Sequence, residues 1–273
     1  MKKTTLIFLC IAMALSGRAQ EKSEPFKLLS IGNSFSGNAH HFLRQITDSM
    51  GDKLILGHAS IGGCSLERHW SNASTNGLSY KYKNKKVTLA EYLQAEKWDV
   101  VTIQQVSNMS RTPSSFEPYG SNLVAFIRQH APQAEIVVHQ IWSYRRPTLD
   151  EMRVSHEKTR KTYHDFAKRY GLRIIPAGDA IQLAREEDGW DAGYVPPNQK
   201  TGASGKGKAL CEDGFHTGPY GSYLIGCLWY EYFFKKNVQA LQYCPKNLSE
   251  EEAIKLRTFA HRTLTETKPV DEP

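Results

Sequence analysis

Residues 28–36 read Leu-Leu-Ser-Ile-Gly-Asn-Ser-Phe-Ser, and this stretch decides the fold that the sequence predicts. A short apolar strand ends in Gly32-Asn33-Ser34, and a polar, helix-compatible segment follows over residues 37–50. Open α/β sheets build their sites where the carboxyl ends of their strands meet. Ser34 is therefore expected at such an edge, although a serine at a strand exit is also a common helix N-cap.

Apolar runs alternate with helix-like stretches along the rest of the chain, which predicts βαβ units and a parallel sheet. The predicted strands are Lys27–Ile31, Lys53–His58, Val100–Gln104, Glu135–Gln140 and Arg173–Pro176. The predicted helices are Ala39–Met50, Thr88–Lys97, Ser115–His130, Leu149–Tyr170, Ala177–Arg185, Gly218–Phe234 and Ser249–Thr265. The segment Gly189–Lys208 is rich in Gly, Pro, Asn, Ser and Lys and is expected to be a binding loop or an insertion.

The length of 273 residues suits one domain that follows an export signal. Residues 1–19 combine two lysines, an apolar run and small residues before a cut at Gln20, which is typical of a secretory signal peptide. The run is too short for a stable membrane span. The expected domain is 20–273, with a core over about 27–235, and the protein is expected to be periplasmic or extracellular.

The net charge and the cysteines limit which partners and which disulfide bonds the sequence predicts. Removal of residues 1–19 takes away Lys2, Lys3 and Arg18, so the formal net charge falls from +7 to +4. No stripe of basic residues is interleaved with aromatics, so nucleic acid is not an expected partner. The irregular spacing of Cys64, Cys211, Cys227 and Cys244 is no disulfide framework. A bond between Cys64 and Cys211, which both lie beside site motifs, stays open.

The segment Asp213-Gly214-Phe215-His216 lies about 180 residues after Ser34. A spacing of three lets the Asp213 carboxylate orient the His216 imidazole, which can then act as a general base. A serine hydroxyl is a poor nucleophile until a base takes its proton. The pattern therefore favours a Ser34–His216–Asp213 arrangement, with no metal or organic cofactor.

Two further segments follow strands and carry groups that could donate hydrogen bonds to an oxyanion. Residues 59–65, Ala-Ser-Ile-Gly-Gly-Cys-Ser, contain glycines that allow close approach of backbone N–H groups. Residues 104–108, Gln-Gln-Val-Ser-Asn, supply side-chain amides. An ordinary turn and loop-capping amides are the alternative interpretations.

Together these blocks resemble those of the SGNH (GDSL-like) hydrolase superfamily, in a branch of secreted bacterial esterases whose first block is Gly-Asn-Ser-Phe-Ser. The resemblance implies a three-layer α/β/α sandwich with a flavodoxin-like five-stranded parallel sheet. It implies Ser34 as nucleophile, His216 and Asp213 as base and acid, and the Gly63 N–H as an oxyanion donor.

The sequence departs from the family pattern at two places. Asn33 replaces the Asp of the usual Gly-Asp-Ser. The usual Gly-x-Asn-Asp block is reduced to Asn108, and Gln105 is a rival donor because related carbohydrate acetylesterases use a Gln at this strand end. Both Gln105 and Asn108 remain candidates for the oxyanion hole.

Aromatic and basic residues after the fourth strand could bind substrate, because aromatic rings stack on sugars and arginines bind carboxylates. The candidates are Trp142, Tyr144 and Arg145, with His69 behind Gly63. A strand-end anchor with solvated arginines is the alternative.

The resulting hypothesis is an exported serine esterase acting on small esters, most simply O-acetyl groups of a polysaccharide. A glycan-binding protein without catalysis, and an acyltransferase, are the alternatives. The glycan, the acyl group and the oligomeric state are not specified by the sequence.

Overall fold

The computed structural model describes residues 24–197 and 205–266. The predicted signal peptide lies outside the described residues, as do residues 198–204 of the Gly189–Lys208 segment. Within the described part, no helix combines the length and apolarity needed to cross a membrane.

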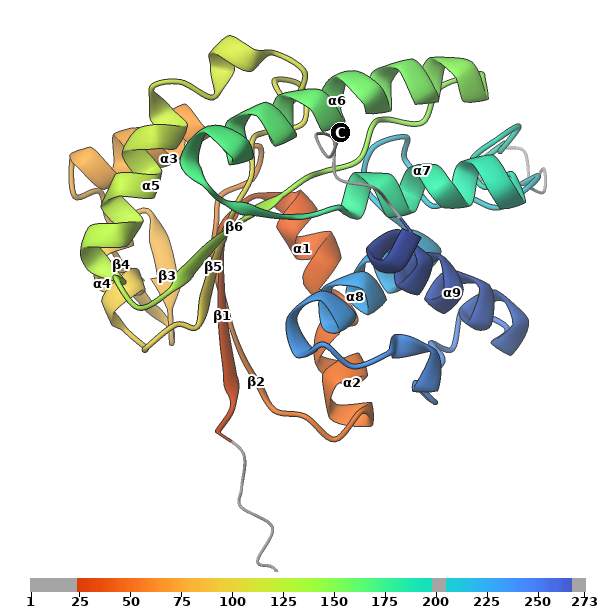
Figure 1. Ribbon diagram of the computed structural model, residues 1–273, viewed down its shortest axis with the longest axis horizontal. Coiled ribbons are helices and arrows are strands. Elements are labelled where there is room, and N and C mark those ends of the chain that lie inside the picture. The colour runs from red at the N-terminus through yellow and green to blue at the C-terminus, as the bar shows by residue number, and fades with distance from the viewer. Residues whose placement is uncertain (1–23, 198–204, 267–273) are drawn as a thin grey trace, which may run out of the picture.

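A five-stranded parallel sheet forms the centre of the molecule (Figure 1). Its strands are β1 (Phe26–Gly32), β2 (Leu54–Ser60), β5 (Val100–Ile103), β6 (Glu135–His139) and β7 (Arg173–Ile175). The spatial order is β2-β1-β5-β6-β7, which is the flavodoxin-like order, so the predicted fold class is confirmed. A separate antiparallel hairpin pairs β3 (Tyr80–Tyr82) with β4 (Lys85–Val87).

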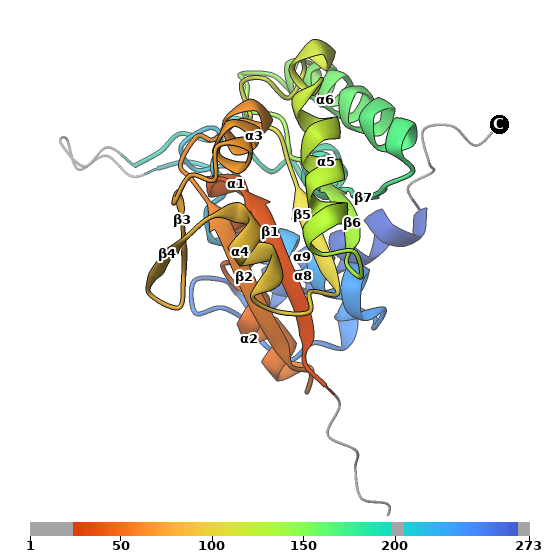
Figure 2. The ribbon, with the colours of Figure 1, turned by 90° about the vertical axis from the view of Figure 1, so that its left-hand side faces the viewer.

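Helices cover both faces of the sheet. They are α1 (Ser34–His40), α2 (Leu43–Ser49), α3 (Leu66–Ser74), α4 (Leu89–Gln94), α5 (Tyr119–His130), α6 (Leu149–Tyr170), α7 (Ala177–Asp188), α8 (Pro219–Phe234) and α9 (Glu250–Glu266). In Figures 1 and 2, α3, α4 and α5 lie on one side, and α1, α2, α8 and α9 lie on the other. This is the predicted three-layer arrangement.

Helix α8 is the most deeply buried helix of its layer. Its Leu224, Trp229 and Tyr230 are fully buried, because α1 and α2 pack on one side of it and α7 and α9 on the other. A helix that is apolar on all sides is stable only inside such a layer. It directly follows Thr217 and Gly218, so the loop that carries Asp213 and His216 ends on a rigid element.

The five strands were predicted to within two residues, and α6 was predicted with its observed bounds. The predicted helix Ala39–Met50 is wrong in outline, since the chain forms α1 and α2, and α1 begins earlier, at Ser34. Helix α3 and the β3–β4 hairpin were not predicted. All four described cysteines are free, so the alternative bond between Cys64 and Cys211 is absent.

Candidate functional site

The site lies at the carboxyl ends of β1 and β5, where the strand order reverses. Chain connections leave this point in opposite directions, so no crossover fills the edge of the sheet between the two strands. Ser34 follows β1, and the segment of residues 104–108 follows β5. Gly32 permits the tight exit from β1, because a Cβ there would lie 2.3 Å from Ser36 Oγ and 3.1 Å from the Gln104 side chain.

Asn33, not Ser34, is the N-cap of α1. Its Oδ1 accepts a hydrogen bond from Phe35 N at 3.1 Å, which braces the turn before Ser34. Ser34 is the first helical residue and is exposed, so its hydroxyl is not used for capping. The N-cap interpretation of Ser34 is therefore wrong, and the hydroxyl is available for another partner.

That partner is His216. Its Nε2 lies 2.7 Å from Ser34 Oγ, and its Nδ1 lies 2.8 Å from Asp213 Oδ2. The other carboxylate oxygen of Asp213 accepts from the backbone N–H groups of Phe215 and His216 at 3.0 and 2.7 Å. Partial burial raises the pKa of Asp213, but these bonds and the one from His216 outweigh it and hold the pKa below its usual value.

The arrangement has the geometry required for proton transfer from a serine. With Asp213 ionised, His216 carries its proton on Nδ1, which leaves Nε2 free to accept the hydroxyl proton of Ser34. Serine, imidazole and carboxylate thus form one continuous chain of hydrogen bonds, with both outer links supplied by exposed side chains.

Gly63 lies beside this chain, at the end of the loop that follows β2. Residue Gly32 pairs with Ser60 in the sheet, and Ile61 N donates to Gly32 O at 3.2 Å, so the two strand exits are adjacent. Gly63 is exposed and has a φ of 59°, a backbone conformation that favours glycine. Its N–H has no acceptor among the described residues, so it is available to a ligand.

Gln105 and Asn108, the two candidate side-chain donors to the oxyanion, differ in their surroundings. Gln105 is fully buried, and its Oε1 accepts from Leu66 N and Val106 N while its Nε2 donates to Ser115 O at 2.7 Å. Both polar atoms of the Gln105 side chain are therefore already hydrogen-bonded inside the protein. Asn108 is exposed in the loop after β5.

The four residues predicted to bind substrate fall into two groups, of which the first is buried. His69 is buried, with Nε2 bonded to Gly32 O and Nδ1 to the Tyr80 hydroxyl, and burial lowers its pKa to about 4. Trp142 is buried as well, and its indole N–H donates to Phe215 O. Neither ring reaches solvent, so in this structure neither contacts a substrate. They support the site from within.

Tyr144 and Arg145 are half-buried. The Tyr144 ring lies 5.7 Å from the ring of Phe215, which is 38 % exposed and next to His216. The Arg145 guanidinium donates to two main-chain carbonyls. Sequence reasoning missed Phe215, although an aromatic residue between an acid and a base was a visible signal.

A buried polar network underlies the serine turn. Gln104 Nε2 donates to Asn33 Oδ1 at 2.8 Å, and Gln104 Oε1 accepts from Ser36 Oγ at 2.5 Å and lies 3.1 Å from His139 Nδ1. Gln104 was named only as one amide of its segment. Sequence reasoning also missed the buried pair Arg185 and Asp191, since nothing local marks either residue.

Comparison with known proteins identifies relatives in structure. The model of the family DUF4886, described as a domain of unknown function, matches residues 27–263. A DUF4886 family protein from Bacteroides uniformis ATCC 8492 is 26% identical, with a TM-score of 0.77 over 90% of this chain and 98% of that chain. No curated protein matches the chain.

More distant structures share the fold. A candidate SGNH hydrolase from Slackia heliotrinireducens is 19% identical, with a TM-score of 0.51 over 76% of this chain and 98% of that chain. The acetyl xylan esterase AlAXEase is 11% identical, with a TM-score of 0.53 over 76% of this chain and 100% of that chain. The fold of the SGNH hydrolases, which the sequence motifs implied, is therefore confirmed.

Proposed function

The chain belongs to the DUF4886 family, and we propose that it is a serine esterase that releases small acyl groups, most simply acetyl, from a polysaccharide. The observation that carries the proposal is the unbroken contact from Ser34 Oγ through His216 to Asp213. A helix cap or a structural hydrogen bond would not need an exposed serine, an imidazole and an ionised carboxylate in this order.

The reaction runs in two steps. His216 Nε2 takes the hydroxyl proton as Ser34 Oγ attacks the ester carbonyl, and the imidazolium returns the proton to the departing alcohol. The acyl group is then bound to Ser34. Water, deprotonated by the same imidazole, attacks the acyl-enzyme and releases the carboxylic acid and the free serine.

Both steps pass through an oxyanion, which needs hydrogen-bond donors. We assign the N–H of Ser34, which has no intrahelical acceptor at the first position of α1, and the N–H of Gly63. Asn108 is assigned as the third donor. Gln105 is not, because turning its amide toward Ser34 would leave the buried N–H groups of Leu66 and Val106 without an acceptor.

The surface around His216 supports a carbohydrate substrate. Phe215 and Tyr144 present two neighbouring aromatic rings beside the base, and aromatic faces stack on the apolar faces of sugar rings. The fold shared with an acetyl xylan esterase supports acetyl as the acyl group. The N-terminal sequence pattern supports export, which cell fractionation tests.

Hydrolysis of p-nitrophenyl acetate by the purified protein tests the proposal. Ser34→Ala and His216→Ala are expected to abolish turnover above background, and a p-nitrophenyl phosphonate is expected to add one phosphonyl group at Ser34. Ser121→Ala is the control, because the Ser121 hydroxyl donates to Pro118 O at the start of α5.

Turnover that survives Ser34→Ala would overturn the assignment. A wild-type protein that binds acetylated xylan but neither turns over an ester nor takes the phosphonyl group would be a glycan-binding protein. Acyl transfer would be recognised by an acetylated sugar acceptor among the products.

A further inference from the structure

The loop that carries the acid and the base runs from the buried Cys211 to His216, and residues 212–216 are exposed or half-buried. The side chains of Asp213 and His216 are 47% and 35% exposed, and Gly214 has a φ of 99°, a backbone conformation that favours glycine. Exposed loops with few apolar contacts open easily. The short distance from His216 to Ser34 therefore requires other contacts to fix this loop.

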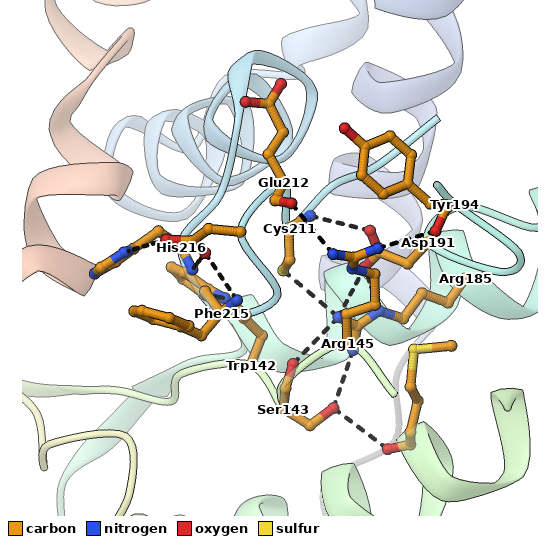
Figure 3. Close-up of polar contacts among 12 residues, drawn as sticks. Trp142, Ser143, Arg145, Arg185, Asp191, Tyr194, Cys211, Glu212, Phe215 and His216 are labelled. Carbon is orange, nitrogen blue, oxygen red and sulfur yellow. Dashed lines mark hydrogen bonds and ion pairs between the residues drawn. The ribbon is translucent and has the colours of Figure 1, made fainter. Parts of the chain in front are cut away.

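The segment after β6 supplies those contacts through hydrogen bonds to the loop's backbone. Arg145 N donates to Gly214 O at 2.7 Å, and Trp142 Nε1 donates to Phe215 O at 2.7 Å. The two accepting carbonyls lie directly between the acid and the base. Figure 3 shows Trp142 and Arg145, which belong to the segment between β6 and α6, beside the loop that carries Phe215 and His216.

The Arg145 side chain adds a second attachment. Its guanidinium donates to Glu212 O and to Tyr194 O, both at 3.2 Å, and lies 4.7 Å from the centre of the Tyr194 ring. Hydrogen bonds from a charged donor are stronger than neutral ones. The charged guanidinium of Arg145 is therefore directed at these two carbonyls.

Trp142 also contacts the nucleophile's side of the site. Its ring stacks on Phe35, with ring centres 4.6 Å apart and planes inclined by 29°, and Phe35 directly follows Ser34. One buried, rigid side chain thus contacts the serine turn through its face and the base-carrying loop through its N–H. The Trp142 ring thus links the segment that carries Ser34 to the loop that carries His216.

A buried ion pair also holds the segment between β6 and α6. Arg185 Nη2 lies 2.8 Å from Asp191 Oδ2, and both side chains are fully buried. Asp191 Oδ1 accepts from Cys211 N at 3.0 Å, while Arg185 donates to Ser143 Oγ at 3.0 Å. The pair therefore joins the first residue of the loop to the residue between Trp142 and Tyr144, as Figure 3 shows.

We propose that Arg145 and Trp142 are positioning residues that hold the Cys211–His216 loop so that His216 stays within proton-transfer distance of Ser34. This rests on the proposed function for its kinetic readout. Neither residue touches the reacting atoms, and both act through the loop. Misplacement of a catalytic group by about 1 Å can cost on the order of a hundredfold in rate.

The test uses Arg145→Met and Trp142→Phe, which keep an apolar side chain and remove the side-chain donors to Glu212 O, Tyr194 O and Phe215 O, while the backbone N–H of residue 145 still reaches Gly214 O. Both are expected to lower kcat for p-nitrophenyl acetate by about tenfold or more, and to slow phosphonylation of Ser34 equally, with KM changed less than about twofold. Arg128→Met is the matched control, because Arg128 also donates to a main-chain carbonyl, that of Tyr170, on the far helix α5.

Two readouts separate positioning from general stability. Guanidinium ion at low millimolar concentration is expected to restore part of the kcat of Arg145→Ala, whereas ammonium is not. Amide exchange of residues 212–216 is expected to accelerate in Arg145→Met while exchange in the sheet stays unchanged. If Arg145→Met does not fold, Arg145→Lys takes its place, with a smaller loss of kcat.

A kcat within twofold of wild type in both variants, or a loss confined to KM, would overturn the proposal. Uniformly faster exchange throughout the protein would do the same. If wild type neither hydrolyses esters nor takes the phosphonyl group, the proposed function fails, while the amide-exchange comparison still decides whether Arg145 holds the loop.

Discussion

The side chain of Asn33 donates from Nδ2 to the carbonyl oxygen of Cys64 at 3.0 Å. The residue before Ser34 is thereby bound to the residue after Gly63. Its Oδ1 meanwhile accepts from Phe35 N and Gln104 Nε2. An aspartate could keep both acceptor roles but has no donor for Cys64 O, so the Asn of Gly-Asn-Ser has a specific structural role in this chain.

Asn33→Asp is therefore expected to release the loop that carries Gly63. A carboxylate oxygen would face the Cys64 carbonyl, and leaving that buried contact unsatisfied costs about 1–3 kcal/mol. The free energy of unfolding should fall by this amount in urea titrations, and kcat for an acetyl ester should fall with it. Asn237→Asp is the control, because Asn237 uses Oδ1 to cap Gln239 N, which an aspartate keeps, and the bond that its Nδ2 donates to Gln239 Oε1 is exposed and long at 3.4 Å. Unchanged stability in Asn33→Asp would contradict this role.

The sequence predicted the sheet well because each strand is a compact apolar run between turn residues. It also brought Ser34, Asp213 and His216 into one hypothesis, since the carboxyl ends of parallel strands share an edge. The split of α1 from α2 was missed because the break at His41 and Phe42 carries no Gly or Pro. Tertiary packing against α8 decides it.

Burial could not be assigned from residue type. Trp142, Arg145 and His69 have side chains suited to sugar or carboxylate binding, yet two are enclosed and the third is bonded to carbonyls. Gln105 and Asn108 differ in the same way. The sequence does not distinguish a polar side chain that faces the substrate from one that hydrogen-bonds buried backbone groups. Only the fold distinguishes the two.

Asn108→Ala and Gln105→Met test which amide completes the oxyanion hole. Loss of a donor to the oxyanion lowers kcat by roughly a hundredfold or more in well-formed sites. Asn108→Ala should show such a fall with an unchanged melting temperature, because Asn108 is exposed. Gln105→Met should lower the melting temperature, because Leu66 N and Val106 N lose their acceptor. A folded Gln105→Met with the larger loss of kcat would reverse the assignment.

Phe215→Ala tests the aromatic surface beside the base. The ring is exposed and its backbone, not its side chain, is held by Asp213 and Trp142. KM for acetylated xylan should rise severalfold, while kcat for p-nitrophenyl acetate, which has no sugar to stack, should stay close to wild type. Phe126→Ala, on the helix α5 away from the site, is the control. Equal losses on both substrates would show that Phe215 acts on the loop instead of the glycan.

His58 should make the protein sensitive to mild acid. Burial lowers the pKa of His58 to about 4, from an ordinary value of 6.5. The unfolded chain therefore binds a proton between these pH values that the folded chain does not, so stability falls as the pH falls through this window. The neighbouring His40, whose ring lies 4.6 Å away, and His139 have pKa values lowered by burial in the same direction.

His58→Phe removes one of these protons. The slope of unfolding free energy against pH between about 6.5 and 4 should decrease, by at most about 1.4 kcal/mol per pH unit for a single histidine. Urea titrations at several pH values measure the slope, with the exposed His41→Phe as control. An unchanged slope in His58→Phe would mean that His58 is protonated in the folded protein as readily as in the unfolded chain.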